Sequence, residues 1–94
     1  MLEIKRLDAQ RVAMRGRLDA SQAALADREL GRITEAVVLD LSGLDYISSA
    51  GLGVLVKLQV RLREANHSLR LADAQPRVRA VFHFANLEEF FGLV

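Results

Sequence analysis

Cysteine and tryptophan are absent from this 94-residue chain, and proline occurs only once. Without thiols the protein can form neither disulfides nor thiolate metal sites, which fits a reducing compartment such as the cytoplasm. The chain also shows no internal repeat, low-complexity stretch or linker. We therefore expect a cytoplasmic protein without a metal or a cofactor. Residues 1–94 should form a single domain, because this length leaves little room for a second core.

Long apolar runs are missing as well. No continuous run exceeds that of residues 36–39, whereas a membrane-spanning helix needs about 18 apolar residues. Residues 1–6 lack the apolar segment of a secretory signal peptide. These absences predict a soluble protein that does not insert into a membrane.

Neither sign of charge dominates, because 13 basic residues face 12 acidic ones and the formal net charge is +1. A nucleic-acid-binding protein usually has a basic excess that is gathered on one face. The arginines of this chain are spread from Arg6 to Arg79, so we expect no nucleic-acid partner. Apolar residues make up 51% of the chain, which is enough for a hydrophobic core.

Alternating apolar residues predict two strands near the N-terminus. In residues 2–7, Leu2 and Ile4 share one face, and residues 11–18 alternate more strictly. The polar segment 8–10 between them suits a hairpin turn, so the two strands should be antiparallel and half-buried. The buried face of the second strand would carry Val12, Met14, Gly16 and Leu18.

Two further strands are expected later in the chain. Residues 36–41 are almost continuously apolar and partly β-branched, which suits a central strand that is covered on both faces. Ser42, Gly43 and Asp45 then mark a loop. Residues 68–72 alternate again and predict a shorter strand.

Three helices are predicted between and after these strands. Residues 23–33 are rich in alanine and follow two candidate N-caps, Asp19 and Ser21. Residues 50–66 carry one buried stripe at helical spacing, made of Gly51, Leu55, Leu58, Leu62 and Ala65. Pro76 suits the first turn of a third helix. The inner face of that helix and the packing segment after it would be Val78, Val81, Phe82, Ala85, Leu87, Phe90 and Phe91.

The resulting order is β-β-α-β-α-β-α, which predicts an α/β fold with a mixed sheet and helices packed on it. Residues 36–72 then form a β-α-β unit, for which a right-handed parallel crossover is the rule. Functional loops in such sheets tend to leave the carboxyl ends of the parallel strands. The segment that contains Ser48 and Ser49 is one of these loops.

Ser48 and Ser49 stand at the expected start of the helix over residues 50–66. The free backbone N–H groups and the dipole of a helix start favour negative charge, so a phosphate on either hydroxyl would be tolerated there. Gly51 and Gly53 keep the first turn small, which would let another protein approach closely. A simple helix cap also explains a serine at this place, and spacing alone favours the cap.

The segment of residues 38–55, VLDLSGLDYISSAGLGVL, resembles the signature of the STAS domain, and more narrowly that of the stand-alone anti-sigma factor antagonists of bacteria. Residues 16–19 resemble the Gly-Glu-Leu-Asp that ends the second strand in this family, and residues 76–87 resemble its third helix and exit. The resemblance therefore covers most of the chain. It implies a STAS-type mixed β-sheet with helices packed on it.

Four features depart from the family's commonest pattern. Ser48 stands where an aspartate usually precedes the acceptor, and Ala50 stands where a serine or threonine often follows it. Arg17 replaces the glutamate of the Gly-Glu-Leu-Asp stretch, and the chain ends at Val94, where many relatives continue into another strand and helix. None of these departures removes the acceptor hydroxyl.

The resemblance implies a regulatory cycle and no catalytic activity of the chain itself. In that family the unphosphorylated antagonist binds an anti-sigma factor, often itself a serine kinase, and thereby releases the regulator that it held. Phosphorylation ends the complex, and a metal-dependent serine/threonine phosphatase resets it. The acceptor position corresponds to Ser49, with Ser48 as the second choice. The alternative is a permanent STAS subunit of a lipid-transport ABC complex, and a homodimer is left open.

The partner surface is expected at the acceptor segment and on the helix after it. At about 100° per residue, Leu52, Val56 and Val60 fall outside the buried stripe and offer an apolar docking row. Three basic residues are expected beside this row, namely Lys57, Arg61 and Arg63. The predicted partner-binding residues are Asp19, Asp45, Ser48, Ala50, Gly51, Leu52, Gly53, Val56 and Val60.

The remaining polar candidates have simpler alternatives. Asp19 would either cap the first helix or contact the kinase or the serine hydroxyl, and Asp45 would be an ordinary loop residue. His67 and His83 have no carboxylate or cysteine partner at a suitable spacing, so neither metal binding nor general-base catalysis is expected of them.

Overall fold

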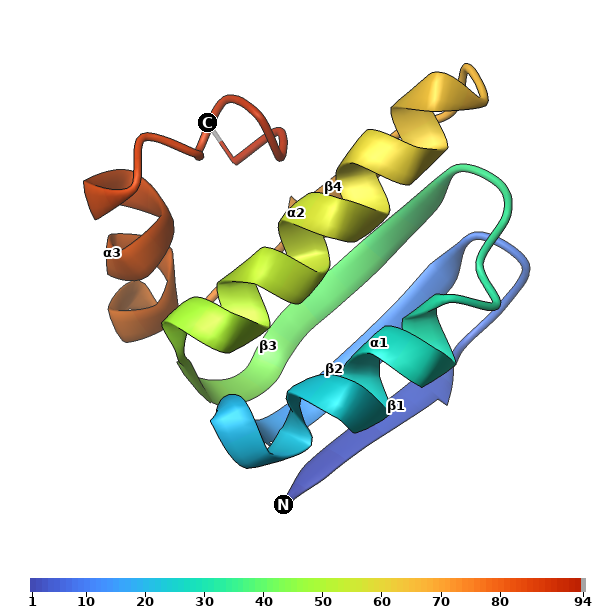
Figure 1. Cartoon of the computed structure of the whole chain (residues 1–94). Helices are drawn as coiled ribbons and strands as arrows, with labels where there is room; N and C mark the ends of the chain where they lie inside the picture. Colours follow the sequence, from blue (N-terminus) through green and yellow to red (C-terminus); the bar gives the residue numbers. More distant parts are fainter. Residues whose placement is uncertain (94) are drawn as a thin grey trace.

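The computed structural model describes residues 1–93, and its helices and strands follow one another in the predicted order β-β-α-β-α-β-α (Figure 1). The strands form one mixed sheet in the order β1-β2-β3-β4. The predicted fold class is therefore confirmed. None of the helices in the described part of the chain has the length and apolar character needed to cross a bilayer.

A hairpin of β1 (Leu2–Arg6) and β2 (Arg11–Leu18) forms one side of the sheet. The Asp8 carboxylate holds its turn by accepting hydrogen bonds from the N–H groups of Gln10 and Arg11 at 2.8 and 2.9 Å. Aspartate is common in turns because its short side chain can satisfy nearby backbone donors in this way. The predicted antiparallel pairing is thus confirmed.

The other two strands, β3 (Val37–Ile47) and β4 (Leu69–Ala72), are parallel to β2 and to each other. The predicted loop at residues 42–45 is wrong, because β3 continues through it. The reason is tertiary pairing: β2 continues alongside, and Leu18 still pairs with Ile47. Two register shifts between β2 and β3 accommodate the polar residues that suggested a turn.

Two helices cover one face of this sheet (Figure 1). They are α1 (Ala23–Leu30), which follows the 3-10 turn η1 (Ala20–Gln22), and α2 (Ser49–Glu64). The third helix, α3 (Pro76–Phe84), lies against β3 beyond the end of the sheet at which α2 begins (Figure 1). Pro76 occupies the first turn of α3, as predicted.

The core lies between the sheet and the α1–α2 layer. The predicted inner face of β2 is confirmed, since Val12, Met14 and Leu18 are all buried. The α2 stripe is confirmed except at Ala65, which is exposed, and it includes the buried Gln59, which was not expected. Ala85, the residue that follows α3, is exposed instead of facing inward.

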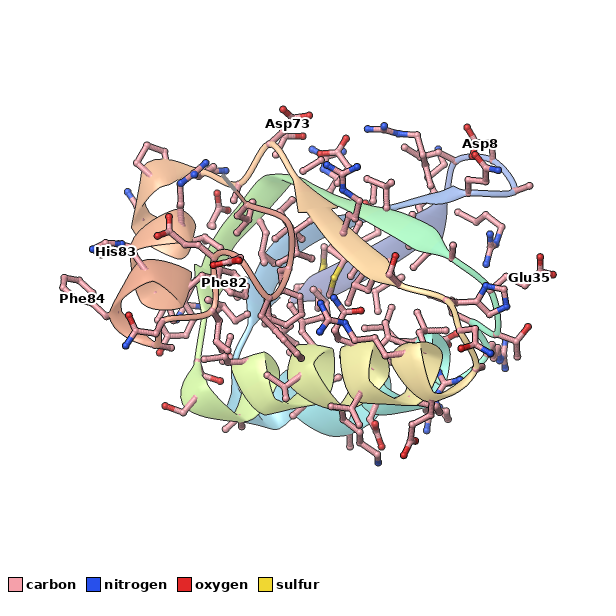
Figure 2. All side chains as sticks on the ribbon, turned by 90° about the horizontal axis from the view of Figure 1, so that it is seen from above. Asp8, Glu35, Asp73, Phe82, His83 and Phe84 are labelled. Carbon is pink, nitrogen blue, oxygen red and sulfur yellow. The ribbon has the colours of Figure 1, made fainter. Side chains whose placement is uncertain are left out.

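Helices from residues 1–93 cover only one face of the sheet. In Figure 2, α2 runs along one side of the sheet, and no helix from the described residues lies over the opposite side. The expectation that residues 36–41 are covered on both faces is therefore wrong. Leu39 and Leu41 point into the core and are fully buried, whereas Val38 and Asp40 point the other way and are partly exposed.

The predicted packing segment after α3 closes the edge of the sheet at β4. The Leu71 N–H donates a hydrogen bond of 3.0 Å to the Phe91 carbonyl oxygen. The rings of Phe82 and Phe91 meet edge to face, with centroids 5.3 Å apart. This pairing gives the exposed backbone of an edge strand a partner within the chain.

Candidate functional site

Ser48 is the single residue between the end of β3 and the start of α2. Its backbone is extended, its N–H donates to the Leu18 carbonyl oxygen at 2.9 Å, and its hydroxyl oxygen accepts the Gly51 N–H at 3.1 Å. Ser48 is therefore the N-cap of α2, and its hydroxyl is already engaged. The capping explanation that the sequence left open holds for this serine.

Ser49 differs from Ser48 although the two are adjacent. It is the first residue of α2, it is exposed, and its hydroxyl makes no hydrogen bond to any of residues 1–93. Ala50 is exposed beside it. Since a helix start leaves its first backbone N–H groups without helical acceptors, an anion carried by Ser49 would find donors and a favourable dipole.

The two glycines of the first turn of α2 have different surroundings. Gly51 is buried, and a Cβ placed on it would lie 2.7 Å from the Leu18 carbonyl oxygen. A Cβ on Gly53 would meet nothing within 4 Å. The small size of Gly51 thus serves the packing of α2 on β2, and its role in the approach of a partner stays a prediction. Gly53 does face open space.

Asp19 follows β2 directly and acts as a helix cap. Its carboxylate accepts hydrogen bonds from the hydroxyl and the N–H of Ser21 at 2.6 and 3.1 Å and lies 3.8 Å from the Arg17 guanidinium. The Ser21 hydroxyl, followed by the backbone donors and Arg17, lowers the pKa of Asp19 below its ordinary value. The cap thus belongs to Asp19 and not to Ser21, and it starts η1 instead of α1.

Asp45 lies on β3, where it was expected in a loop. Its carboxylate accepts a hydrogen bond of 3.3 Å from the Gln75 side chain, which also donates to the Ser42 carbonyl oxygen at 2.8 Å. Gln75 is the residue before α3. These contacts fix the start of α3 against the end of β3, close to the serine pair.

The apolar row on α2 is less exposed than expected. Val60 is 46% exposed, whereas Leu52 and Val56 are half-buried against the core. Lys57 and Arg61 do not lie beside this row, because they contact α1 through Asp27 (3.2 Å) and the Leu30 carbonyl oxygen (3.2 Å). The basic residue on the expected side is Arg63, which lies over the Phe90 ring at 4.6 Å.

One histidine has a partner that the spacing did not reveal. His83 Nδ1 lies 2.8 Å from Glu88 Oε1, and the Arg79 guanidinium lies 3.2 Å from the other carboxylate oxygen. His83 is on the outside of α3 and points away from the sheet (Figure 2). Among the described residues, no group of three histidine or carboxylate side chains could hold a metal ion.

Almost the whole chain matches the model of a known family. The family model of the MlaB STAS domain matches residues 3–94. The chain belongs to the STAS domain family. The resemblance of residues 38–55 to the STAS signature is thereby confirmed.

A relative of known sequence extends the comparison. BtrV from Bordetella bronchiseptica, which carries a provisional description as an anti-sigma factor antagonist, is 42% identical over 74 residues. The match includes 79% of this STAS chain and 60% of BtrV, so the chain spans about three fifths of that relative's length.

Solved structures share the fold of this STAS domain. An anti-sigma factor antagonist from Mycobacterium paratuberculosis gives a TM-score of 0.81 at 22% identity, over 97% of this chain and 81% of that one. The phosphorylated form of SpoIIAA, a Bacillus cell fate determinant, gives 0.69 at 20% identity, over 95% and 86%. At these sequence identities the similarity establishes a shared fold and nothing more.

Proposed function

We propose that this STAS domain is an anti-sigma factor antagonist that works as a phosphorylatable partner switch, with Ser49 as the acceptor. The observation that carries the proposal is the difference in hydrogen bonding and exposure between the two serine hydroxyls. The Ser48 hydroxyl is engaged as the cap of α2, whereas the Ser49 hydroxyl is exposed and makes no hydrogen bond within residues 1–93. A kinase needs a hydroxyl that it can reach, and Ser49 offers one.

The relatives support the same function. BtrV is 42% identical to this chain over 74 residues, and its provisional description is that of an anti-sigma factor antagonist. SpoIIAA has been solved in an unphosphorylated and in a phosphorylated form, and both share the fold of this chain, with TM-scores of 0.67 and 0.69. A fold common to both forms of that protein fits a switch that acts at the surface.

Phosphorylation would act through the interface and leave the domain folded. A phosphate on Ser49 adds about −1.5 to −2 charges at a helix start, where the dipole and the first N–H groups favour a negative charge. A partner that had packed on a neutral hydroxyl would then face a dianion, with Asp19 close to the same end of the sheet. A loss of about 3 kcal/mol in binding free energy would weaken the complex more than a hundredfold.

Phosphate transfer tests this proposal directly. We expect the protein to gain one phosphate when it is incubated with ATP and an anti-sigma factor that has serine kinase activity, and mass spectrometry should place it on Ser49. Ser49→Ala should abolish the incorporation, and Ser48→Ala should retain it. Phosphate on Ser48 would refute the assignment. No incorporation, together with tight binding to a transporter ATPase, would favour the alternative of a permanent subunit in a lipid-transport complex.

The partner surface has a test of its own on α2. Val60→Asp should leave the fold intact, because Val60 is 46% exposed, and should weaken capture of the anti-sigma factor at least about tenfold by placing a charge in an apolar contact. Leu7→Asp is the matched control, since Leu7 is 49% exposed but lies in the turn of the hairpin. Isothermal calorimetry measures both. Equal affinities of the two variants would remove α2 from the interface.

A further inference from the structure

The side of the sheet opposite α1 and α2 is a surface that the proposed switch does not use. Strand register identifies its members, because residues paired across neighbouring strands point to the same side. Lys5 pairs with Ala13, and Ala13 pairs with Asp40. We call this surface the open face. Its members are Glu3, Lys5, Arg11, Ala13, Arg15, Arg17, Val38, Asp40, Tyr46, Arg70 and Ala72.

The open face concentrates positive charge in a nearly neutral chain. It holds five basic side chains and two carboxylates. Since the whole chain has 13 basic and 12 acidic residues, eight basic and ten acidic ones remain elsewhere. Asp8 and Asp73 belong to the loops at the border of this face (Figure 2). The strands themselves therefore present a basic centre, which attracts acidic surfaces.

Two of these arginines are held against the sheet. A Cβ on Gly43 would lie 2.7 Å from Arg15 Cγ, so the absence of a side chain at Gly43 lets Arg15 lie across β3. The Arg17 guanidinium lies over the Tyr46 ring at 4.3 Å and 3.8 Å from the Asp19 carboxylate, so part of its charge is already paired. A guanidinium that is already positioned loses less conformational freedom when it binds a carboxylate, and its planar fork suits bidentate pairing.

We propose that the open face binds an acidic segment of a second protein. A protein segment fits better than single-stranded nucleic acid, because Tyr46 is the single aromatic side chain of the face and its ring is already covered by Arg17. A second copy of the chain fits poorly, since two basic faces repel each other. The proposal goes beyond the switch at Ser49: with α2 on the other side of the sheet, the domain can hold an acidic partner whether or not Ser49 is phosphorylated.

An NMR titration with a synthetic peptide of alternating glutamate and glycine tests the open face. The amide signals of the four strands should shift during the titration, and added salt should reverse the shifts. The double variant Arg15→Glu/Arg70→Glu should weaken binding by about tenfold or more. The control, Arg28→Glu/Arg77→Glu, makes the same change in net charge on α1 and α3 and should change binding less than about twofold. Ser49→Glu should leave the affinity unchanged.

The other outcomes overturn the proposal. Equal weakening by the two double variants would show a response to net charge alone, and shifts confined to α1 and α2 would place the peptide on the wrong face. Tighter binding of oligothymidine or of phosphatidylglycerol vesicles than of the peptide would assign the face to nucleic acid or to lipid. Because this titration needs neither kinase nor anti-sigma factor, its failure leaves the phosphate-transfer result standing, and the reverse also holds.

Discussion

At the scale of single residues, the two adjacent serines should separate stability from modification. Ser48→Ala removes the hydroxyl that accepts the Gly51 N–H at 3.1 Å and should lower the free energy of unfolding by about 1 kcal/mol, the usual loss for a helix cap. Ser49→Ala should change it by less than about 0.5 kcal/mol, as expected for an exposed side chain that makes no hydrogen bond within residues 1–93. Urea unfolding compares the two variants. Equal losses would mean that Ser49 shares in the cap.

The carboxylate of Asp19 should make stability depend on pH. The Ser21 hydroxyl holds the pKa of Asp19 below its ordinary value of 3.8, so the folded state favours the ionised form. The contribution is therefore complete above that ordinary value and is lost as the pH falls through the lowered pKa. The difference in unfolding free energy between the wild type and Asp19→Asn should be present at pH 7 and shrink in acid. A difference that stays constant with pH would exclude this carboxylate as its source.

The sequence located the serine pair but could not divide its roles. Which serine caps α2 depends on where β3 ends, and β3 extends to Ile47 only because β2 pairs with it that far. Gln59 shows the same limit. It lies four residues after Leu55, on the buried stripe, but its polar side chain predicts an exposed position. It is buried because it bonds to residues 10 and 31 positions away in the chain. Local patterns carry no signal for such contacts.

At the scale of elements, the two glycines of α2 should respond in opposite directions to the same substitution. Gly51→Ala would bring a Cβ to 2.7 Å from the Leu18 carbonyl oxygen and should cost about 1–3 kcal/mol of stability through overpacking. Gly53→Ala meets open space and should stabilise the helix by about 0.5–1 kcal/mol. Thermal unfolding monitored by circular dichroism measures both. Stabilisation by Gly51→Ala would contradict the packing of α2 on β2.

Periodicity predicted the number, type and order of the elements and failed where tertiary contacts decide. The alternation in β2 gave the correct buried face, because one side of that strand meets the helices. The polar residues of β3 favoured a turn locally, yet pairing with β2 kept the chain extended. Val38 extended an apolar run and so suggested a strand covered on both faces, but it points to the open face.

At the scale of the whole molecule, the charge distribution became visible only through the sheet. Basic residues that are scattered along the sequence gather on one face, because alternate positions of paired strands point to the same side. Net charge is a property of composition, whereas a charged face is a property of register. The spread of arginines therefore gave no sign of the basic centre on the open face.

Gln59 links α2 to β4 and to the segment after α3, so its substitution should affect the stability of the whole molecule. From the middle of α2 its amide donates to the carbonyl oxygens of Leu69 and Phe90 at 2.8 and 2.7 Å and accepts the Leu69 N–H at 2.7 Å. The side chain is 1% exposed, so loss of these bonds cannot be made good by water. Gln59→Met keeps the volume but leaves the Leu69 N–H without this partner, and should cost about 2 kcal/mol of unfolding free energy.

The loss should be uneven across the structure, which separates it from a general weakening. Amide hydrogen exchange of Leu71, whose N–H donates to Phe91, should accelerate more in Gln59→Met than that of Leu39 in the centre of the sheet, because Gln59 anchors the segment after α3 at Phe90. Gln10→Met, at an exposed turn residue, should change stability by less than about 0.5 kcal/mol. Uniform acceleration of both amides would mean that Gln59 stabilises the fold as a whole and does not hold the C-terminal segment in particular.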